Sequence, residues 1–237
     1  MRNRQALFLD FDIKEQPDDV TCGPTCLHAL YQYYEDSISL KDVIREVKQF
    51  KTGGTLAVML GDHALHRGYK ATIYTYNLNV FDPTWFKYSR RKIIDLLKRQ
   101  MRHKSHKRKL MIECDAYIQF LEAGGKVMNA ELNKELIKSY LKKSIPVLTG
   151  LSATYLYGTP REIGETNKYH SIKGEPAGHF VVINGYDEKA DYAYMADPLN
   201  PNPHKSQYYN VKFDRLINSI MLGIVTYDAN LLIIEAK

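Results

Sequence analysis

The spacing of apolar residues changes near the middle of the chain, and this change limits the folds that are available. Up to about residue 143, apolar residues recur every three or four positions, as in helices that bury one face. Later, short apolar runs between turn residues predict strands at residues 145–151, 179–186, 191–196, 208–213, 223–227 and 231–235, with a helix at 214–221. A mainly helical part followed by a mainly antiparallel sheet predicts the α+β class.

Capping and breaker residues indicate where the helices of the first part begin and end. Ser39 is a possible N-cap, and Gly68 is expected to end a helix. We expect helices at about residues 22–34, 40–50, 56–68, 90–102 and 130–143. Between them we expect a strand at residues 70–77, a loop at residues 82–89 and a turn at Gly124-Gly125.

Length and composition favour a globular protein without cross-links. The 237 residues, 44% of them hydrophobic and 25% charged, suit one domain, residues 1–237, with a helical lobe at about 14–143 and a β-sheet lobe at about 144–237. No apolar run approaches the roughly 18 residues of a membrane span, and the N-terminus lacks the features of a secretory signal. The odd number of cysteines, three, favours a reducing compartment, so we expect a cytoplasmic protein.

Much of the positive charge lies in one segment, residues 87–109. It contains eleven Lys or Arg and one acid, whereas the formal net charge of the whole chain is +6. We interpret it as a helix that buries Ile93, Ile94, Leu96, Leu97 and Met101 and exposes its cations to water, away from any catalytic groove. The alternative partners are an acidic substrate tail or a nucleic acid, but no nucleic-acid-binding motif accompanies the segment, so we expect no nucleic-acid partner.

A cysteine at the start of the first expected helix is a candidate for chemistry. It lies in the stretch QPDDVTCGPTC, residues 16–26. Unpaired N–H groups and the positive end of the helix dipole favour the thiolate of Cys22. Gly23 permits a tight turn, Pro24 suits the first helical turn, and Gln16 can fold back to donate to an oxyanion near Cys22. A lone cysteine at such a place is more often a core thiol, so a second signal is needed.

That signal is a histidine and an aspartate on two consecutive expected strands. His179 opens the apolar strand GHFVVINGYD, and Asp197 follows the next strand, in YAYMADP. In an antiparallel hairpin, the start of one strand lies beside the end of the next. We therefore expect the His179 imidazole to neighbour the Asp197 carboxylate, as an oriented catalytic base requires.

The string Q-x5-C-G-P, followed by GHFVVINGYD and ADP, resembles the C39-like cysteine peptidases, a branch of the papain-like fold. The resemblance covers residues 14–35 and 140–227. It implies a papain-like α+β fold and the metal-independent hydrolysis of a peptide or related amide bond, without a cofactor. The catalytic residues that it implies are Cys22 as nucleophile, His179 as general base and acid, Asp197 as orienting residue and Gln16 as oxyanion donor.

The polar loop at residues 152–176 is a candidate for a flap over the substrate. We assign Tyr155 and Tyr157 of this loop to substrate binding, together with Gly178. His170, in the same loop, is a further candidate base. The alternative is that the loop is an exposed insertion.

The remaining cysteines and histidines do not form a recognisable metal site. Cys26 lies four residues after Cys22, and no further ligands follow at zinc-site spacing, so we expect Cys26 to be a core residue. The histidine pairs lack a carboxylate at motif spacing, and we expect them to be solvated: His63 and His66, and His103 and His106.

Two other functions remain open at this stage. An acyltransferase could use the same thiol chemistry, with an amine in place of water. A C39-like module could bind peptides without cutting them, although the four implied catalytic residues argue against a purely binding role. We expect a peptide or amide substrate as the partner; the oligomeric state stays open.

Overall fold

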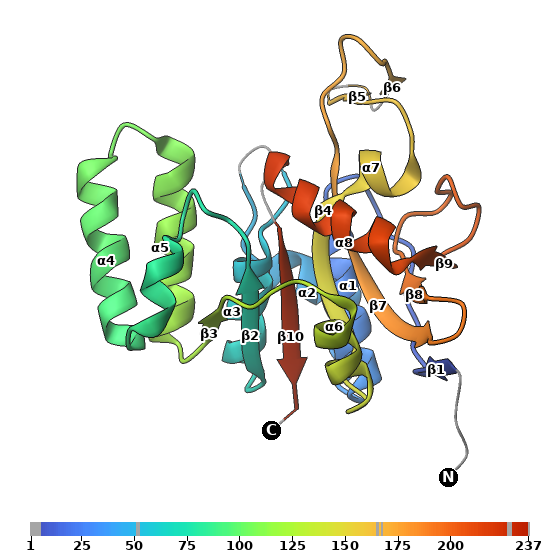
Figure 1. Cartoon of the computed structure of the whole chain (residues 1–237), viewed down its shortest axis with the longest axis horizontal. Helices are drawn as coiled ribbons and strands as arrows, with labels where there is room; N and C mark the ends of the chain where they lie inside the picture. Colours follow the sequence, from blue (N-terminus) through green and yellow to red (C-terminus); the bar gives the residue numbers. More distant parts are fainter. Residues whose placement is uncertain (1–5, 51–52, 165, 167, 227–228, 237) are drawn as a thin grey trace.

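One large, mainly antiparallel sheet crosses the molecule (Figure 1). The computed structural model describes residues 6–50, 53–164, 166, 168–226 and 229–236, and within them eight strands form this sheet. Its order is β3-β2-β10-β4-β7-β8-β9, and β1 pairs with the far end of β7. The strands are β1 (Ala6–Phe8), β2 (Lys70–Thr75), β3 (Lys126–Met128), β4 (Val147–Ser152), β7 (Gly178–Asp187), β8 (Tyr192–Ala196), β9 (Tyr208–Lys212) and β10 (Asn230–Glu235).

Helices cover both faces of the sheet, and the two faces form separate hydrophobic cores. The helices are α1 (Cys22–Tyr33), α2 (Leu40–Glu46), α3 (Ala57–His66), α4 (Arg90–His103), α5 (Arg108–Glu122), α6 (Lys134–Leu141), α7 (Ala153–Tyr157) and α8 (Phe213–Leu222). The first core joins α1, α3 and α5 to one face, and the second joins α6 and α8 to the other. Side chains of β7 alternate between them: Phe180 and Val182 face the first core, and Val181 and Ile183 the second. Because both faces are covered, β7 is apolar along most of its length.

The predicted α+β class is confirmed, and most elements lie where the sequence placed them. The sheet also takes β2 and β3 from the part that the sequence assigned to the helical lobe. β2 is the predicted strand at residues 70–77, whereas the three-residue strands β1 and β3 were too short for the apolar pattern to reveal. The expected loop at residues 82–89 contains a short 3-10 helix, η1 (Pro83–Lys87).

The predicted strand at residues 223–227 is wrong. Gly223–Val225 forms a 3-10 turn, η2, that directly continues α8. The backbone N–H of Thr226 donates to the carbonyl of Gly223 at 3.0 Å, which closes the turn. The last residue of that prediction, Tyr227, lies outside the described residues.

The basic segment forms α4 and the start of α5, an antiparallel helix pair at one end of the molecule with α4 outermost (Figure 1). Ser89 caps α4, because its side chain accepts a hydrogen bond from the backbone N–H of Lys92. Of the five apolar residues expected to be buried, Ile93 and Leu97 are buried and the other three are half-buried. The helix prediction is confirmed, with a narrower buried face than expected.

Candidate active site

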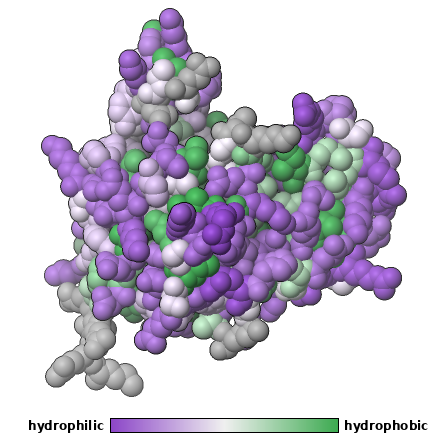
Figure 2. Space-filling view, turned by 180° about the vertical axis from the view of Figure 1, so that it is seen from behind, coloured by the Kyte–Doolittle hydropathy of each residue, from purple (hydrophilic) through white to green (hydrophobic). Residues whose placement is uncertain are grey.

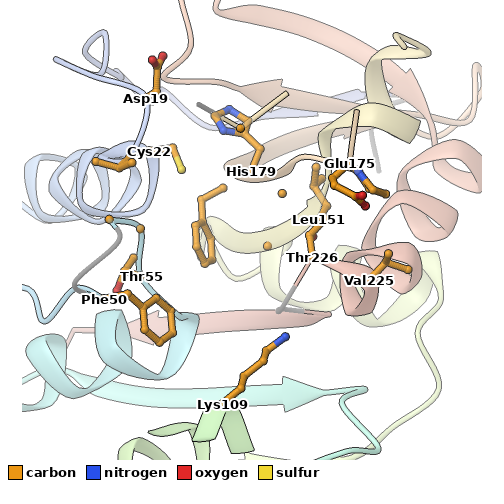
Figure 3. A pocket seen from close by; sticks show the side chains of 18 of the residues that line it. Asp19, Cys22, Phe50, Thr55, Lys109, Leu151, Glu175, His179, Val225 and Thr226 are labelled. Atoms are coloured by element: carbon orange, nitrogen blue, oxygen red, sulfur yellow. The ribbon is translucent and has the colours of Figure 1, made fainter. Parts of the chain in front are cut away.

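Cys22 and His179 meet at the wall of a cavity of about 720 Å³ (Figure 3). Cys22 is the first residue of α1, and His179 is the second residue of β7. The Cys22 sulfur turns toward the His179 ring (Figure 3), and the hydrogen-bonding and charge of His179 lower the pKa of the thiol. The structure thus brings together a thiol and an imidazole that the sequence placed far apart in the chain.

Local packing explains why α1 begins at Cys22. The Thr21 hydroxyl donates back to the carbonyl of Asp18 at 3.2 Å, so the chain turns immediately before the helix. Gly23 lies so close to α3 and β7 that a Cβ at this position would be 2.7 Å from Cγ2 of Thr55. A glycine after the cysteine therefore allows the first turn of α1 to pack tightly beside the cavity.

Asp197 orients the imidazole, and the sheet register explains why. Val182 of β7 pairs with Ala196 of β8, which puts the residue after β8 beside the first residues of β7. The Nε2 atom of His179 lies 2.8 Å from Oδ1 of Asp197, and both side chains are buried. Because Nε2 is occupied by the carboxylate, Nδ1 is the ring nitrogen left to face the thiol.

Three further donors hold the Asp197 carboxylate. The backbone N–H of Leu199 donates to Oδ1 at 2.9 Å. The hydroxyls of Tyr157 and Tyr209 both donate to Oδ2, at 2.7 and 2.6 Å. Asp197 is completely buried, so these bonds replace the water that an ionised carboxylate would otherwise need. The role of Tyr209 was not predicted from the sequence; its only signal there is its place in the expected strand that follows Asp197.

The site favours a thiolate beside an imidazolium. Burial raises the pKa of the Cys22 thiol, but the hydrogen bond and charge of His179, with backbone hydrogen bonds at Phe180 and Gly23, bring it below its usual value. For His179, burial lowers the pKa, but the charge and hydrogen bond of Asp197 act in the opposite direction, and the pKa is raised to about 10. Burial also raises the pKa of Asp197, but its bonds and the His179 charge hold it below the usual range. The Cys22 sulfur is therefore activated while His179 keeps its proton.

The other two cysteines are ordinary buried thiols. Cys26 is completely buried, and its sulfur donates to the backbone carbonyl of Phe180 at 3.3 Å. Burial raises the pKa of both Cys26 and Cys114. Cys26 is a core residue, as expected, and all three cysteines are free thiols.

Gln16 lies at the edge of the site, beside the segment that follows Asp197. Its backbone N–H donates to the carbonyl of Pro198 at 2.9 Å, and its side-chain Nε2 donates to the carbonyl of Asp18 at 2.8 Å. The side chain is nearly buried, and its Oε1 has no hydrogen-bond partner among the described residues. One N–H of the amide is therefore used to shape the turn before α1, and the other remains as a donor.

The residues expected to bind substrate divide into two groups. Gly178 lines the cavity. Tyr157 does not, because its hydroxyl is held by Asp197. Tyr155 also does not, because its ring lies 5.3 Å from the guanidinium of Arg215. Neither tyrosine is thus part of the cavity wall, and their contact with a substrate stays a prediction.

The loop at residues 152–176 projects above the cavity end of the sheet (Figure 1). It contains α7 and a small hairpin of β5 (Glu162–Ile163) and β6 (Lys168–Tyr169), and its Gly164 and Glu175 line the cavity. His170 closes a turn here: its Nδ1 accepts from the backbone N–H groups of Ile172 and Lys173. His170 is thus occupied away from Cys22.

Residues distant in the sequence complete the cavity. They include Phe50, Thr55, Lys109, Ile112, Gly150 and Val225. The prediction that the basic segment lies away from the groove is therefore wrong for Lys109, because the first turn of α5 faces the cavity. Among the described parts of the chain, no three His, Cys, Asp or Glu side chains gather as metal ligands. His63 is not solvated as expected, since its Nδ1 bonds to the Tyr31 hydroxyl at 2.8 Å and its side chain is only 9% exposed.

Comparison with known families decides the classification. A model of the Peptidase_C39 like family matches residues 8–219. The chain belongs to this family. The match extends over α2 to α6, which the sequence resemblance did not cover, so the basic helix pair lies inside the family domain. No helix in the described parts of the chain is long and apolar enough to cross a membrane.

Two solved structures are similar to this member of the Peptidase_C39 like family. The first is a putative C39-like peptidase from Bacillus anthracis, with 14% identity, a TM-score of 0.54 and coverage of 98% of both chains. The second is a double glycine motif protease from an AMS/PCAT transporter in complex with the leader peptide; it has 14% identity, a TM-score of 0.46, and 99% of this chain and 96% of that chain covered. At this identity, the first likeness shows the fold alone. A comparison with curated proteins found no match.

Proposed function

We propose that this chain is a cysteine peptidase that hydrolyses a peptide or related amide bond. The observation that carries the proposal is the buried His179–Asp197 pair, at 2.8 Å, beside a Cys22 thiol whose pKa is lowered. Burial alone would make both the imidazolium and the thiolate unfavourable. An arrangement that holds both charges at the wall of an open cavity is expected for a nucleophile.

The proposed reaction needs only the groups at this site. The Cys22 thiolate attacks the substrate carbonyl carbon, and the Cys22 N–H and the Gln16 amide donate to the resulting oxyanion. The His179 imidazolium gives its proton to the leaving amine as the C–N bond breaks. His179, now neutral, then takes a proton from water, which attacks the thioester, releases the acid and regenerates the Cys22 thiolate beside the imidazolium. Asp197 stays ionised and holds the imidazole throughout.

Three features support hydrolysis by one catalytic domain in a reducing compartment. The cavity is open, so water can reach a thioester on Cys22. The three cysteines are free thiols, which suits a cytoplasmic enzyme. The groups of the site come from both ends of the chain, and we therefore propose that residues 1–237 act as one unit.

Two linked measurements test this function. Iodoacetamide at mildly acidic pH should modify Cys22 before Cys26 and Cys114, as read by intact mass and peptide mapping. A proteome-derived peptide library should then gain new N-termini with the wild type and none with Cys22→Ala. An acyltransferase would also free new N-termini but would join the acyl fragments to other amines instead of releasing them as acids, and a binding module would give neither product. Equal modification of the three cysteines would contradict the proposal.

A further inference from the structure

A second cavity, of about 360 Å³, adjoins the catalytic cavity at Lys109, which lines both. Three lysines line it where α4 passes into α5: Lys104, Lys107 and Lys109. Residues 77–79, after β2, and Ile224 of η2 form its other side. Lys109 reaches toward the catalytic cavity from the side opposite Cys22 (Figure 3). The two cavities therefore meet at Lys109, and we call the second, lysine-lined cavity the extension.

The charges at the two ends of this path are opposite. Asp19 lines the catalytic cavity beside Cys22 and Glu175 lines it on the opposite side (Figure 3), whereas the three lysines line the second cavity. One acid, Glu113, also lines the second cavity, but it is only 3% exposed, and its Oε1 lies 3.9 Å from Nζ of Lys109. Burial raises the pKa of Glu113, and three lysines stand against this one acid. The extension therefore presents a net positive charge to anything that enters it.

Exposed apolar side chains follow the same path. Val20 is 38%, Ile112 45% and Val225 61% exposed at the catalytic cavity, and Leu78 is 66% exposed at the extension. Large apolar side chains that are exposed together along a hollow are typical of a surface that a ligand covers. Isolated surface cations would not need this apolar lining. Figure 2 shows hydrophobic residues scattered among hydrophilic ones on the face that it presents, so exposure of apolar side chains does not by itself identify a binding surface. The four residues named here are distinguished by lining the two adjoining cavities.

We propose that this lysine-lined extension binds acidic side chains of the substrate, so that the enzyme selects peptides with an acidic segment at a distance from the bond that is cut. This inference rests on the proposed peptidase function and deepens it. Apolar substrate side chains would cover Ile112, Val225 and Leu78, and carboxylates beyond them would face Lys104, Lys107 and Lys109. Attraction to such a site would raise the rate of encounter and orient the chain.

The basic helix pair contains its own control. Arg91, Lys92 and Arg99 of α4 are exposed and line neither cavity, although they belong to the same basic segment. Replacing these three by Gln changes the net charge by the same amount as replacing Lys104, Lys107 and Lys109 by Gln. Comparison of the two variants therefore separates binding at the extension from a general effect of the positive charge on this segment.

The experiment measures labelling of Cys22 by iodoacetyl peptides, in which the sulfur displaces iodide and forms a C–S bond. Each probe has two to six Gly or Leu residues and then three Glu, three Gln or three Lys. The iodoacetyl group is placed at the N-terminus in one series and at the C-terminal residue in the other, so both chain directions are sampled. Second-order labelling rates come from intact mass.

For the wild type, we expect the best Glu probe to react about tenfold faster than its Gln partner, as three weak, partly screened charge pairs can provide. The Lys104→Gln/Lys107→Gln/Lys109→Gln variant should lose this preference, and Arg91→Gln/Lys92→Gln/Arg99→Gln should keep it. Added salt should reduce it. Thermal unfolding of both variants checks that they fold.

The proposal is overturned if no Glu probe is preferred in either series, or if both triple variants lose the preference equally. Its failure is distinct from failure of the peptidase function. If iodoacetamide still selects Cys22 and the library is still cut, only the acidic subsite is wrong. If Cys22 does not react selectively, the proposed function itself fails.

Discussion

Tyr157 and Tyr209 converge on one oxygen, Oδ2 of Asp197, at 2.7 and 2.6 Å. Tyr157 ends α7, and Tyr209 lies in β9, so two separate elements hold the same carboxylate. Because Oδ1 bonds to His179 and Oδ2 to the two hydroxyls, the carboxylate cannot rotate without losing several bonds. The tyrosines thereby fix both the charge and the direction of Asp197, and through it the imidazole.

We therefore predict that Tyr157→Phe and Tyr209→Phe each lower kcat/KM about tenfold, the effect of one lost hydrogen bond to a buried charge. The pKa of His179 should fall in both variants, because a less stabilised Asp197 holds the imidazolium less well. The pH dependence of Cys22 alkylation measures this shift. Tyr155→Phe is the matched control, since its ring lies against Arg215. A loss of stability without a change in the pH profile would assign the tyrosines a purely structural role.

Cys22→Ala should abolish turnover and leave the fold intact, because the side chain is only partly buried at the start of α1. Cys26→Ala should instead keep the thiol chemistry and lower stability, because it leaves a small cavity in the first core. Peptide cleavage and thermal unfolding of the two variants distinguish the roles. Residual cleavage by Cys22→Ala above the background of the buffer would argue against the nucleophile.

Gln16→Ala is expected to lower kcat about 10²–10³-fold, the usual effect of losing one oxyanion donor. It should also lower stability by about 1 kcal/mol, because the amide donates to the Asp18 carbonyl in the turn before α1. Gln16→Glu keeps the size of the side chain and removes both amide donors, so kcat measured beside urea unfolding separates the oxyanion role from the hydrogen bond in the turn. Equal kcat for Gln16→Glu and the wild type would exclude the oxyanion role.

Activity should have a basic limb near pH 10. There His179, with its pKa raised to about 10, loses the proton that the leaving amine needs. The acid limb follows Cys22, whose pKa lies below 9.0.

The stabilisation from His179 is complete below about pH 6.5, its unfolded value, and is lost as pH rises through 10. Asp197 contributes in the opposite way: its stabilisation is present above its unfolded pKa and is lost as pH falls through its lowered one. Measurement of kcat/KM against pH tests the two limbs of activity, and urea unfolding against pH tests the two stability trends. A basic limb near pH 6.5 would contradict the raised pKa of His179.

The sequence predicted the His179–Asp197 contact because hairpin topology alone sets it. Two consecutive antiparallel strands must bring the start of β7 beside the end of β8, whatever the rest of the fold does. The α4 helix was predictable for a similar reason, since its apolar period and the Ser89 cap are local.

The sequence could not predict contacts that depend on how separate elements pack. Tyr157 was assigned to a flap because its loop is long and polar, but the position of α7 directs its hydroxyl to Asp197. Lys109 was assigned to a solvated face, because apolar periodicity shows which side of a helix is apolar but not which elements pack against the helix. Its place at the cavity follows from the angle at which α5 packs on α3, for which the sequence contains no local signal.

Cys22 and His179 lie far apart in the chain, and β7, which carries His179, lies between β4 and β8 in the sheet. During synthesis, Cys22 leaves the ribosome long before His179. Until β7 is paired, nothing lowers the pKa of the Cys22 thiol beyond the helix start itself. The reactive sulfur is thus acquired only when β7 has joined the sheet, after most of the chain has been made.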